Sequence, residues 1–472
     1  MIARLGLCLS SVFRRTAPEP FVLAVLLTIL TALLAVAFGT TGEGAADRAI
    51  GAFDAWRSGD GLWRFLAFSM QMCLILVTGY ALACSRPAAA MIARLAALPR
   101  TGASAAAIVA LVAMTCGLVN WGLGLIVGAL LAREVGRSCA QRGVAAHYPL
   151  LAAAGYTGML VWHGGLSGSA PLTMTTRENA ARVLDAETLE RFGGEGVPLS
   201  ETLGSTLNLV GTGGLLMLVP LVLVLLMPKK AAEIETIDRF MSDPNLPEKI
   251  VNPEPVPSGA ADEVTWPDRL SRSRVLAWFL GLLFLAGVVR TGVVLGPLRV
   301  GLDEINMLML GLGLMAHASL GSYGRAVEEG ARGCAGVILQ FPLYAGIMAM
   351  VVASGLAARL AGGLAEAAGD RGLPVATFFS AGIVNLFVPS GGGQWGIQGP
   401  IALESGVAAG IEPGSMIMAV AFGDQLTNML QPFWALPLLA ITGVRARDVV
   451  GYTAVVMVAG GAWLGLTLLV LA

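Results

Sequence analysis

Long apolar segments alternate with short polar segments along the whole chain. The apolar segments lie at 21–38, 64–84, 103–131, 149–172, 204–227, 275–296, 305–321, 331–353, 374–408, 414–440 and 450–472. Most of them are close to the length of about 20 residues that an α-helix needs to cross the hydrocarbon core of a bilayer. The pattern therefore predicts an all-α polytopic membrane protein.

The composition points to the same class. Of the 472 residues, 56% are hydrophobic and 13% are charged, whereas soluble proteins carry about 25% charged residues. The lipid bilayer is thus one predicted partner, and the net charge of −1 gives no indication of a nucleic-acid partner. The six cysteines form no C-x-x-C pair and the three histidines lie far apart in the sequence, so neither a metal site nor a cofactor is predicted.

Basic residues in short loops mark the cytoplasmic side of a membrane protein. Arg14 and Arg15 therefore place the N-terminus in the cytoplasm. Arginines flank the segment 103–131 on both sides, so both of its ends are expected inside. Because roughly 29 residues are too few for two full spans, we predict a re-entrant helical hairpin that turns at 120–124, where the sequence is NWGLG.

The same reasoning extends to the C-terminus. The polar, proline-rich stretch 228–273 is predicted to be a cytoplasmic linker. The segment 374–408 is again one hairpin long, and its turn falls at the sequence VPSGGG, at 388–393. Arg445 and Arg447 follow the span 414–440 and mark its inner end, which leaves the C-terminus in the periplasm. We expect about nine full spans plus two hairpins.

Two parts of the sequence resemble each other at a constant separation. The motif ARLA at 93–96 recurs at 358–361, and GLVN at 117–120 recurs, after the same separation, as GIVN at 382–385. The first hairpin would enter from the cytoplasm and the second from the periplasm. We therefore predict two inverted repeats, 1–227 and 274–472, with the connecting helix 275–296 supplying the inversion. Amphipathic stretches at 86–100 and 354–370 precede the hairpins and are expected to lie in the membrane interface as arms.

Each predicted hairpin is followed by a span that small and polar residues interrupt, at 149–172 and 414–440. Inverted repeats with broken helices near the membrane midplane are typical of secondary transporters, and irregular backbone at that depth must be buried in protein or line a cavity. The N-termini of half-helices favour an anion. Since no Lys or Arg is expected deep in these four elements, a carboxylate would be held by N–H groups, hydroxyls and amides.

The candidate substrate-binding residues lie at the two turns and the two interruptions. They are Asn120, Gly122, Gly124, Gly164, Gly165, Ser167, Gly168, Ser169, Asn385, Ser390, Gly391, Gly392, Gly393, Gln394, Trp395, Gln398, Thr427 and Asn428. A structural alternative stands beside this interpretation. The two asparagines at the turns could cap half-helices, and the two glutamines could bridge packed helices.

Asp424 is predicted to lie in the interior of a span, where acids are costly and functional by default. We expect it to carry a coupling proton or to ligate Na⁺, together with Gln425, Asn120 and Asn385. The alternative is an acid near the outer interface that caps or pairs. His163 lies near the first interruption, where a hydrogen-bonded histidine is expected. The sequence does not decide between H⁺ and Na⁺ as the coupling ion.

At these residues the sequence resembles the short-chain fatty acid transporter family. The matching motifs are NWGLGLIVGALLAREV (120–135), GGLSGSAPL (164–172), QFPLYAGI (340–347), VPSGGGQWGIQGP (388–400) and GDQLTNMLQPFWALP (423–437). The resemblance implies uptake of short monocarboxylates such as butyrate or acetoacetate across the bacterial inner membrane. It also places the chain near the ion-transporter superfamily, which implies an elevator-type architecture and a homodimer. Asp424 beside Gln425 departs from the Glu–Gln pair of the family by a shorter acid.

Two other classes of protein are weighed against a transporter. The motif GLSG at 165–168 matches the G-x-S-G of rhomboid intramembrane proteases, which would make Ser167 a nucleophile with His317 as its base. That interpretation leaves the repeat and VPSGGG unexplained. A passive anion channel is the other alternative, and uphill transport would distinguish a transporter from it.

Overall fold

The computed structural model describes residues 2–181, 189–190, 196–240, 265–295, 302–317 and 319–472. Throughout these ranges the chain is helical and contains no β-strand. The all-α class expected from the sequence is thus confirmed. Of the expected linker 228–273, residues 241–264 lie outside the described part of the chain.

The helices of the first half follow the apolar segments closely. They are α1 (Ile2–Thr16), α2 (Pro20–Phe38), α3 (Ala45–Arg57), α4 (Leu66–Cys84), α5 (Arg86–Ala97), α6 (Gly102–Val119), α7 (Trp121–Gln141), α8 (Tyr148–Tyr156), α9 (Ser169–Thr173), α10 (Arg177–Ala180) and α12 (Thr206–Leu226). Short 3₁₀ turns join them at η1 (Thr157–Leu160), η2 (Trp162–Gly164) and η3 (Leu199–Glu201).

The second half begins after two short turns, η4 (Ala231–Glu233) and η5 (Ile237–Arg239). Its helices are α13 (Trp266–Ser271), α14 (Arg274–Leu295), α15 (Leu302–Ala316), α16 (Leu320–Ala331), α17 (Ala335–Ala353), α18 (Leu356–Asn385), α19 (Gly391–Ala408), α20 (Pro413–Thr427), α21 (Pro432–Thr442) and α22 (Ala446–Leu471), with the turns η7 (Arg332–Cys334) and η8 (Asn428–Leu430). A proline in the first two positions opens α2, α5, α8, α13, α20 and α21. Proline fits there because a helix has no partner for its first N–H groups.

Seven helices of the described residues are long and apolar enough to cross a membrane. They are Pro20–Phe38, Leu66–Cys84, Gly102–Val119, Thr206–Leu226, Arg274–Val294, Leu320–Ala353 and Ala446–Leu471. The expected number of full spans was nine. Three expected spans are missing from this set: 149–172 and 414–440 are divided into shorter helices, and α15 ends at Ala316 after 15 residues. One span is added, because α6 was expected to be part of a hairpin.

The two expected hairpins are helix pairs with longer arms than the apolar segments indicated. The helices α6 and α7 pack against each other on either side of Asn120, but α7 continues to Gln141 and has 21 residues. The apolar segment 103–131 is thus shorter than the helix pair itself, which extends over 102–141. Similarly, α18 is one helix of 30 residues, so the stretch 354–370 is largely the first part of an arm. The stretch 86–100, in contrast, forms the separate helix α5.

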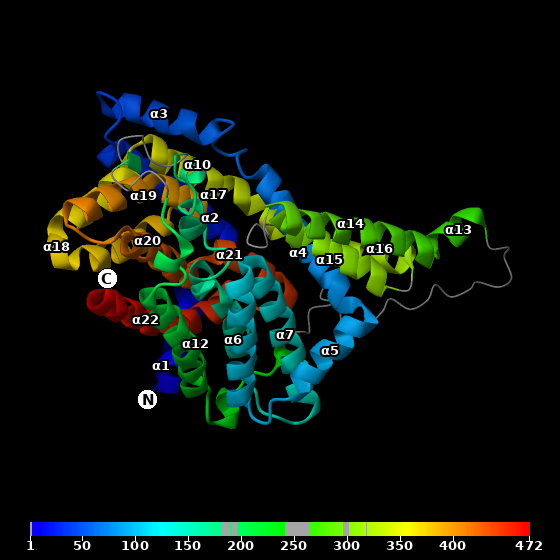
Figure 1. The fold of residues 1–472 in the computed structure, drawn as a ribbon. Helices are drawn as coiled ribbons and strands as arrows, with labels where there is room; N and C mark the ends of the chain where they lie inside the picture. The colour runs from blue at the N-terminus through cyan, green and yellow to red at the C-terminus, as the bar shows by residue number, and fades with distance from the viewer. Residues whose placement is uncertain (1, 182–188, 191–195, 241–264, 296–301, 318) are drawn as a thin grey trace.

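Corresponding helices make the same contacts in both halves of the chain. The pair α6–α7 packs on α8, and α6 also packs on α12. In the second half the pair α18–α19 packs on α20, and α18 packs on α22. The helices α14, α15 and α16 leave this body as an arm on one side, and α3 lies across one end of the body (Figure 1). The arm contacts the body through α4, against which α15 and α16 pack.

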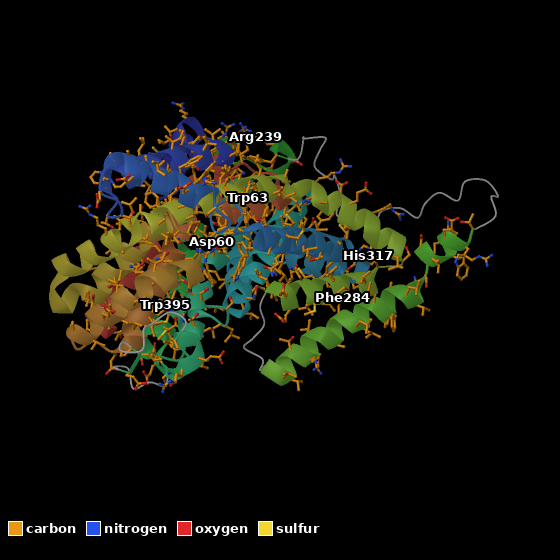
Figure 2. The ribbon with its side chains drawn as sticks, turned by 90° about the horizontal axis from the view of Figure 1, so that it is seen from above. Asp60, Trp63, Arg239, Phe284, His317 and Trp395 are labelled. Carbon is orange, nitrogen blue, oxygen red and sulfur yellow. The ribbon has the colours of Figure 1, made fainter. Side chains whose placement is uncertain are left out.

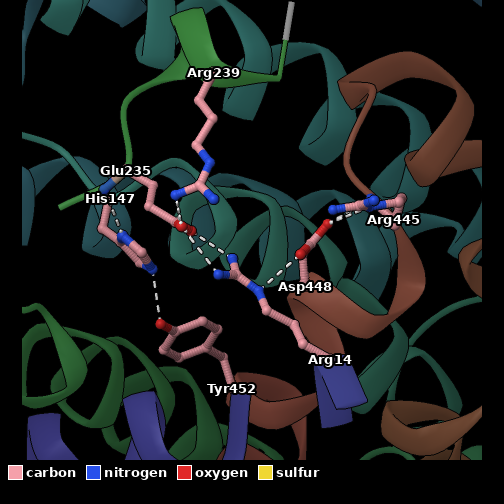
Figure 3. Close-up of polar contacts among 7 residues, drawn as sticks. All are labelled: Arg14, His147, Glu235, Arg239, Arg445, Asp448 and Tyr452. Carbon is pink, nitrogen blue, oxygen red and sulfur yellow. Dashed lines mark hydrogen bonds and ion pairs between the residues drawn. The ribbon is translucent and has the colours of Figure 1, made fainter. Parts of the chain in front are cut away.

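A cluster of charged residues joins α1, the segment after α12 and the start of α22 (Figure 3). Nη1 of Arg14 donates a hydrogen bond of 2.9 Å to Glu235, and Nε of Arg14 lies 2.8 Å from a carboxylate oxygen of Asp448. Arg239 and Arg445 approach the same two acids from outside. Since the two acids come from distant parts of the sequence, Arg14 fixes the amphipathic helix α1 to both.

His147, in the loop before α8, belongs to this cluster and is buried. Its Nδ1 accepts a hydrogen bond of 3.0 Å from the backbone N–H of Glu235, and its Nε2 lies 2.7 Å from the hydroxyl of Tyr452. Burial lowers the pKa of His147 to about 4, an effect to which Arg14 adds and which Glu235 opposes. The imidazole is therefore neutral at pH 7, with its proton on Nε2.

Candidate functional site

The first helix pair is interrupted at a single residue. Asn120 has an extended backbone conformation, with φ −157°, between the end of α6 and the start of α7. Its side-chain oxygen accepts hydrogen bonds from the N–H groups of Gly122, at 2.9 Å, and Leu123, at 3.2 Å. Asn120 is therefore the N-cap of α7, which is the structural role considered as the alternative. An Asn at this point ends one helix and begins the next without leaving buried donors unpaired.

The first broken segment packs directly on this junction. The hydroxyl of Ser167 accepts a hydrogen bond of 3.0 Å from the N–H of Trp121, and the N–H of Leu166 donates to the carbonyl of Leu118 at 2.7 Å. Gly165 lies so close to Leu118 that a Cβ would collide with its carbonyl oxygen. Ser167 thus supplies an acceptor for the first turn of α7, and glycine is required beside it.

The second helix pair is interrupted over 386–390. Ser390 is the N-cap of α19, because its hydroxyl accepts a hydrogen bond of 3.2 Å from the N–H of Gly393. A Cβ built on Gly392 would meet no atom within 4 Å, and the same holds for Gly396 one turn later. The first turns of α19 therefore border open space along one side.

Asn385, the last residue of α18, joins this pair to the second broken segment. Its side-chain amide donates to the carbonyl of Asp424 at 2.7 Å, to the hydroxyl of Thr427 at 3.0 Å and to the side-chain oxygen of Asn428 at 2.9 Å. Asn385 is fully buried, and Gln431 donates to its backbone carbonyl. Buried polar networks of this kind fix one arrangement of the backbone because each unpaired group is costly.

The two halves of the chain meet at His163 and Asp424. Nε2 of His163 lies 3.1 Å from Oδ1 of Asp424, and both side chains are buried, with 1% and 4% of their surface exposed. The backbone N–H of His163 donates to the side-chain oxygen of Gln425 at 3.0 Å. A Cβ on Gly391 would lie 2.8 Å from the His163 ring. The first turn of α19, the first broken segment and the second broken segment are thus in contact.

The expectation for His163 was therefore wrong. Neither ring nitrogen has a hydrogen-bond partner among the described residues, and the ring instead faces the carboxylate of Asp424 while packing on Trp162 at a centroid distance of 3.6 Å. Asp424 is 3% exposed and its carboxylate pairs with His163 inside the protein, which agrees with the pairing part of the alternative. His163 was the only histidine expected inside a broken span. This position in the sequence could have indicated that it contacts the acid of the other broken span.

Tyr156 contributes to the site although sequence analysis did not single it out. Its hydroxyl lies 2.9 Å from the carbonyl of Asn428 and 3.2 Å from that of Gln431. These carbonyls belong to the break between α20 and α21, where that of Asn428 also accepts a hydrogen bond of 3.0 Å from the N–H of Gln431. Tyr156 thus stabilises the second break from the first half of the chain.

Some candidate residues serve the packing of their own helix pair. The side-chain amide of Gln394 donates to the carbonyl of Ala381 at 2.8 Å and to Gln398 at 3.1 Å, and Gln398 donates to Ser380 at 3.2 Å. Both glutamines are buried, and Trp395 is buried beside them. The two glutamines thus join α19 to α18, which agrees with the bridging alternative.

Several candidate glycines allow close approach of helices. A Cβ on Gly124 would lie 2.6 Å from Gly117 in α6. Gly164 and Gly168 are similarly confined, by the side chain of Thr212 and by the carbonyl of His163. Glycine is needed at these three positions for packing. The open face at Gly392 is a different situation, because a side chain there would enter free space.

One cation lies deeper in a helix pair than the sequence indicated. Arg133 is 1% exposed and lies in the extension of α7, where Nη1 donates a hydrogen bond of 3.4 Å to the carbonyl of Ile441 near the end of α21. A positive charge at a helix C-terminus is favourable. At 1.5 Å per residue, Arg133 lies about 18 Å along α7 from Trp121, so it does not contribute to the junction.

The serine protease alternative is excluded by the partners of the two residues. Nε2 of His317 lies 2.8 Å from the carbonyl of Ala81 and Nδ1 lies 3.4 Å from the hydroxyl of Ser322, whereas Ser167 caps Trp121. Figure 2 shows His317 near the arm, far from Trp395 of α19. The described residues also contain no group of three or more His, Cys, Asp or Glu that could hold a metal ion.

Membrane-length helices and a buried polar site where four interrupted segments meet define a polytopic membrane protein of the transporter class. The chain belongs to the short-chain fatty acid transporter family, whose model, described as "Short chain fatty acid transporter", matches residues 1–471. A protein of Escherichia coli K12 is 35% identical over 99% of this chain and 100% of its own length. One of Haemophilus influenzae is 34% identical over 96% of each chain. Both carry the description "Putative short-chain fatty acid transporter".

Two solved structures are also similar to this chain. The Alcanivorax borkumensis YdaH transporter is 20% identical, with a TM-score of 0.43 over 96% of this chain and 97% of that one. MtrF of Neisseria gonorrhoeae, described as one of a class of antimetabolite efflux pumps, is 15% identical, with a TM-score of 0.38 over 96% and 95%. The family assignment itself comes from the full-length sequence matches, and it agrees with the prediction that the protein is not an enzyme.

Proposed function

We propose that the protein is a secondary active transporter for short-chain monocarboxylates such as butyrate or acetoacetate in the bacterial inner membrane. Transport would be coupled to H⁺ or Na⁺ and would proceed by alternating access. The observation that carries this proposal is the contact of His163, in the first broken segment, with both Asp424 of the second broken segment and the first turn of α19. The family of the chain supports the substrate class.

The substrate carboxylate binds at the first turn of α19, beside Gly392. The N-terminus of a helix offers backbone N–H groups and a positive dipole end to an anion. The open space beside Gly392 and Gly396 leaves room for a short alkyl chain along the helix. Glycine keeps side chains out of the way of the ligand.

The two helix pairs are re-entrant hairpins, and the two halves are inverted repeats with an elevator-type motion between them. The equal order of helix contacts in both halves supports the repeat. The boundaries 1–227 and 274–472 and a homodimeric assembly complete this architecture. Arg14, Arg15, Arg445 and Arg447 place the N-terminus and the end of α21 in the cytoplasm by the positive-inside rule.

A cavity beside the second break supplies the route to the cytoplasm. It measures about 310 Å³, and its lining includes Tyr156, Gln431, Ala446 and Arg447. This volume lies at the lower limit of ligand pockets, which suits a substrate of few atoms. Arg447 gives it a positive charge that attracts a carboxylate.

The test is counterflow of labelled butyrate in proteoliposomes that are preloaded with unlabelled butyrate. Protein-free liposomes run alongside, because protonated butyric acid crosses lipid. Transient accumulation of label above that control is the expected result. Folded protein that shows no counterflow with butyrate or acetoacetate would remove the substrate assignment. Accumulation against a gradient, driven by imposed H⁺ or Na⁺ gradients, separates a transporter from a channel.

A further inference from the structure

His163 and Asp424 form the one contact between opposite titratable groups that links the two broken segments in the described structure. His163 comes from η2 in the first half and Asp424 from α20 in the second half. Nε2 faces Oδ1 at 3.1 Å, while Nδ1 is buried without a hydrogen-bond partner among the described residues. The pair therefore has a vacant nitrogen that can accept a proton, directly beside the first turn of α19.

The surroundings of the pair hold few other charges. The elements packed on η2 are η1, α6, α9 and α20; of these, η1 and α9 carry no titratable side chain and α6 carries only Cys116. On α19, Glu404 lies more than three turns beyond Gly391. Of the described side chains on α18, Arg359 donates to the carbonyl of Phe38, and on α22 Arg447, Asp448 and Tyr452 lie in the first two turns.

We propose that His163 and Asp424 bind one proton between them and thereby couple one H⁺ to each carboxylate anion that is carried. This inference rests on the proposed function and names the coupling ion for the same site. In this proposal the pair without its shared proton carries one negative charge, and so does the empty site. A substrate anion entering alone would make two buried negative charges in a small volume, which is strongly unfavourable.

One proton removes this conflict. It binds the lone pair of Nδ1 of His163, so that the imidazolium neutralises Asp424 and the carboxylate enters a site without net charge. The loaded site then carries one negative charge, the same as the empty site. The moving part therefore crosses the membrane with equal charge in both directions, and the net cycle transfers one proton and one anion. Transport is electroneutral, and the proton leaves for the side on which the anion is released.

The experiment measures whether the membrane potential drives uptake. Proteoliposomes with equal pH on both sides receive a potassium-diffusion potential through valinomycin, and the initial uptake of labelled butyrate is recorded beside counterflow. Wild-type protein should show counterflow and uptake independent of the potential. Asp424→Asn should make uptake depend on the potential: the neutral amide admits the anion without a proton, so an inside-positive potential should accelerate uptake several-fold. His317→Gln, at a buried histidine outside the site, serves as the control and should behave as wild type.

The outcomes distinguish a failure of the proposed function from a failure of the proposed proton coupling. Absence of counterflow in folded wild-type protein contradicts the proposed function. Counterflow with potential-dependent uptake in wild-type protein contradicts the coupling by this pair. For Asp424→Asn, the coupling is contradicted if uptake stays independent of the potential or if the folded variant loses counterflow. If Asp424→Asn does not fold, His163→Gln replaces it: uptake should remain electroneutral while the pH midpoint of uptake moves. An unchanged midpoint would overturn the inference.

Discussion

Tyr156 and Asn428 are separated by 272 positions in the sequence, yet the hydroxyl of Tyr156 donates a hydrogen bond of 2.9 Å to the carbonyl of Asn428. One residue ends α8 in the first half, and the other begins the break after α20 in the second half. The bond therefore connects the two broken helices across the centre of the molecule. It lies next to the contact of His163 with Asp424, so the same region of the fold is held by two independent polar interactions.

Removing the hydroxyl of Tyr156 should lower the stability of the protein. In Tyr156→Phe the carbonyls of Asn428 and Gln431 lose the hydroxyl donor, but that of Asn428 keeps the N–H of Gln431, so the expected cost is about 1 kcal/mol. Thermal unfolding of the purified protein in detergent measures the loss. Tyr323→Phe is the matched control, since the buried hydroxyl of Tyr323 has no hydrogen-bond partner among the described residues. Equal melting temperatures for both variants would show that the bond contributes nothing.

The two N-caps are open to a direct test of their combined roles. Replacing Asn120 or Ser390 by Ala removes the acceptor for the first turn of α7 or α19 and should cost about 1 kcal/mol of stability each. Uptake of butyrate should fall in both variants at normal membrane levels, because both junctions border the proposed site. Asn120→Ser retains an acceptor and should recover most of the stability. Wild-type uptake in both Ala variants would mean that the substrate binds elsewhere.

The burial of His147 predicts an acid-sensitive fold. Its pKa is about 4 in the folded protein and near 6.5 when unfolded, so the unfolded chain binds more protons between these values. Stability is therefore complete above about pH 6.5 and decreases as the pH falls toward 4. Melting temperatures measured from pH 7.5 to pH 5 should decline, and His147→Gln should show a shallower decline. The lowered pKa of Glu235 acts in the same direction at still lower pH, so a residual decline is expected in the variant.

Blocking the cavity beside the second break should slow release to the cytoplasm. Ala446 lines this cavity, and Ala446→Trp would fill much of it. Counterflow should fall several-fold. Val458→Trp is the control, because Val458 lies on the same helix and is 67% exposed. If both variants transport equally well, the cavity is a crevice for lipid or detergent and does not form the route.

The sequence predicted the helix junctions well because their signals are local. A polar or glycine-rich stretch inside an apolar segment cannot continue as an ordinary transmembrane helix, and the breaks at Asn120 and before Gly391 fall where NWGLG and VPSGGG stand. The lengths of the arms were less predictable. Hydropathy alone predicted that the first helix pair ends at residue 131, whereas α7 continues to Gln141. Its later charged residues lie among other helices and are partly or fully buried.

The contacts between the halves could not be read from local sequence. The N–H of His163 reaches Gln425 across 262 positions, and no spacing rule connects them. The broken segments do carry a recognisable composition, so their participation in one site could be expected from the repeat. Which side chain faces which was decided by packing. The inward-facing glutamines Gln394 and Gln398 illustrate this: their polarity suggested a ligand, but they hydrogen-bond to each other and to α18.

The most direct measurement compares Gly392→Val with Gly213→Val in butyrate counterflow. A Cβ at either position meets no atom within 4 Å, and both residues lie in helices, so both variants should fold and reach the membrane equally. The side chain at position 392 enters the space beside the first turn of α19, whereas Gly213 lies in α12. If the substrate binds beside Gly392, we expect Gly392→Val to lose counterflow while Gly213→Val keeps the wild-type level. Full counterflow in Gly392→Val would contradict the placement of the substrate at this turn.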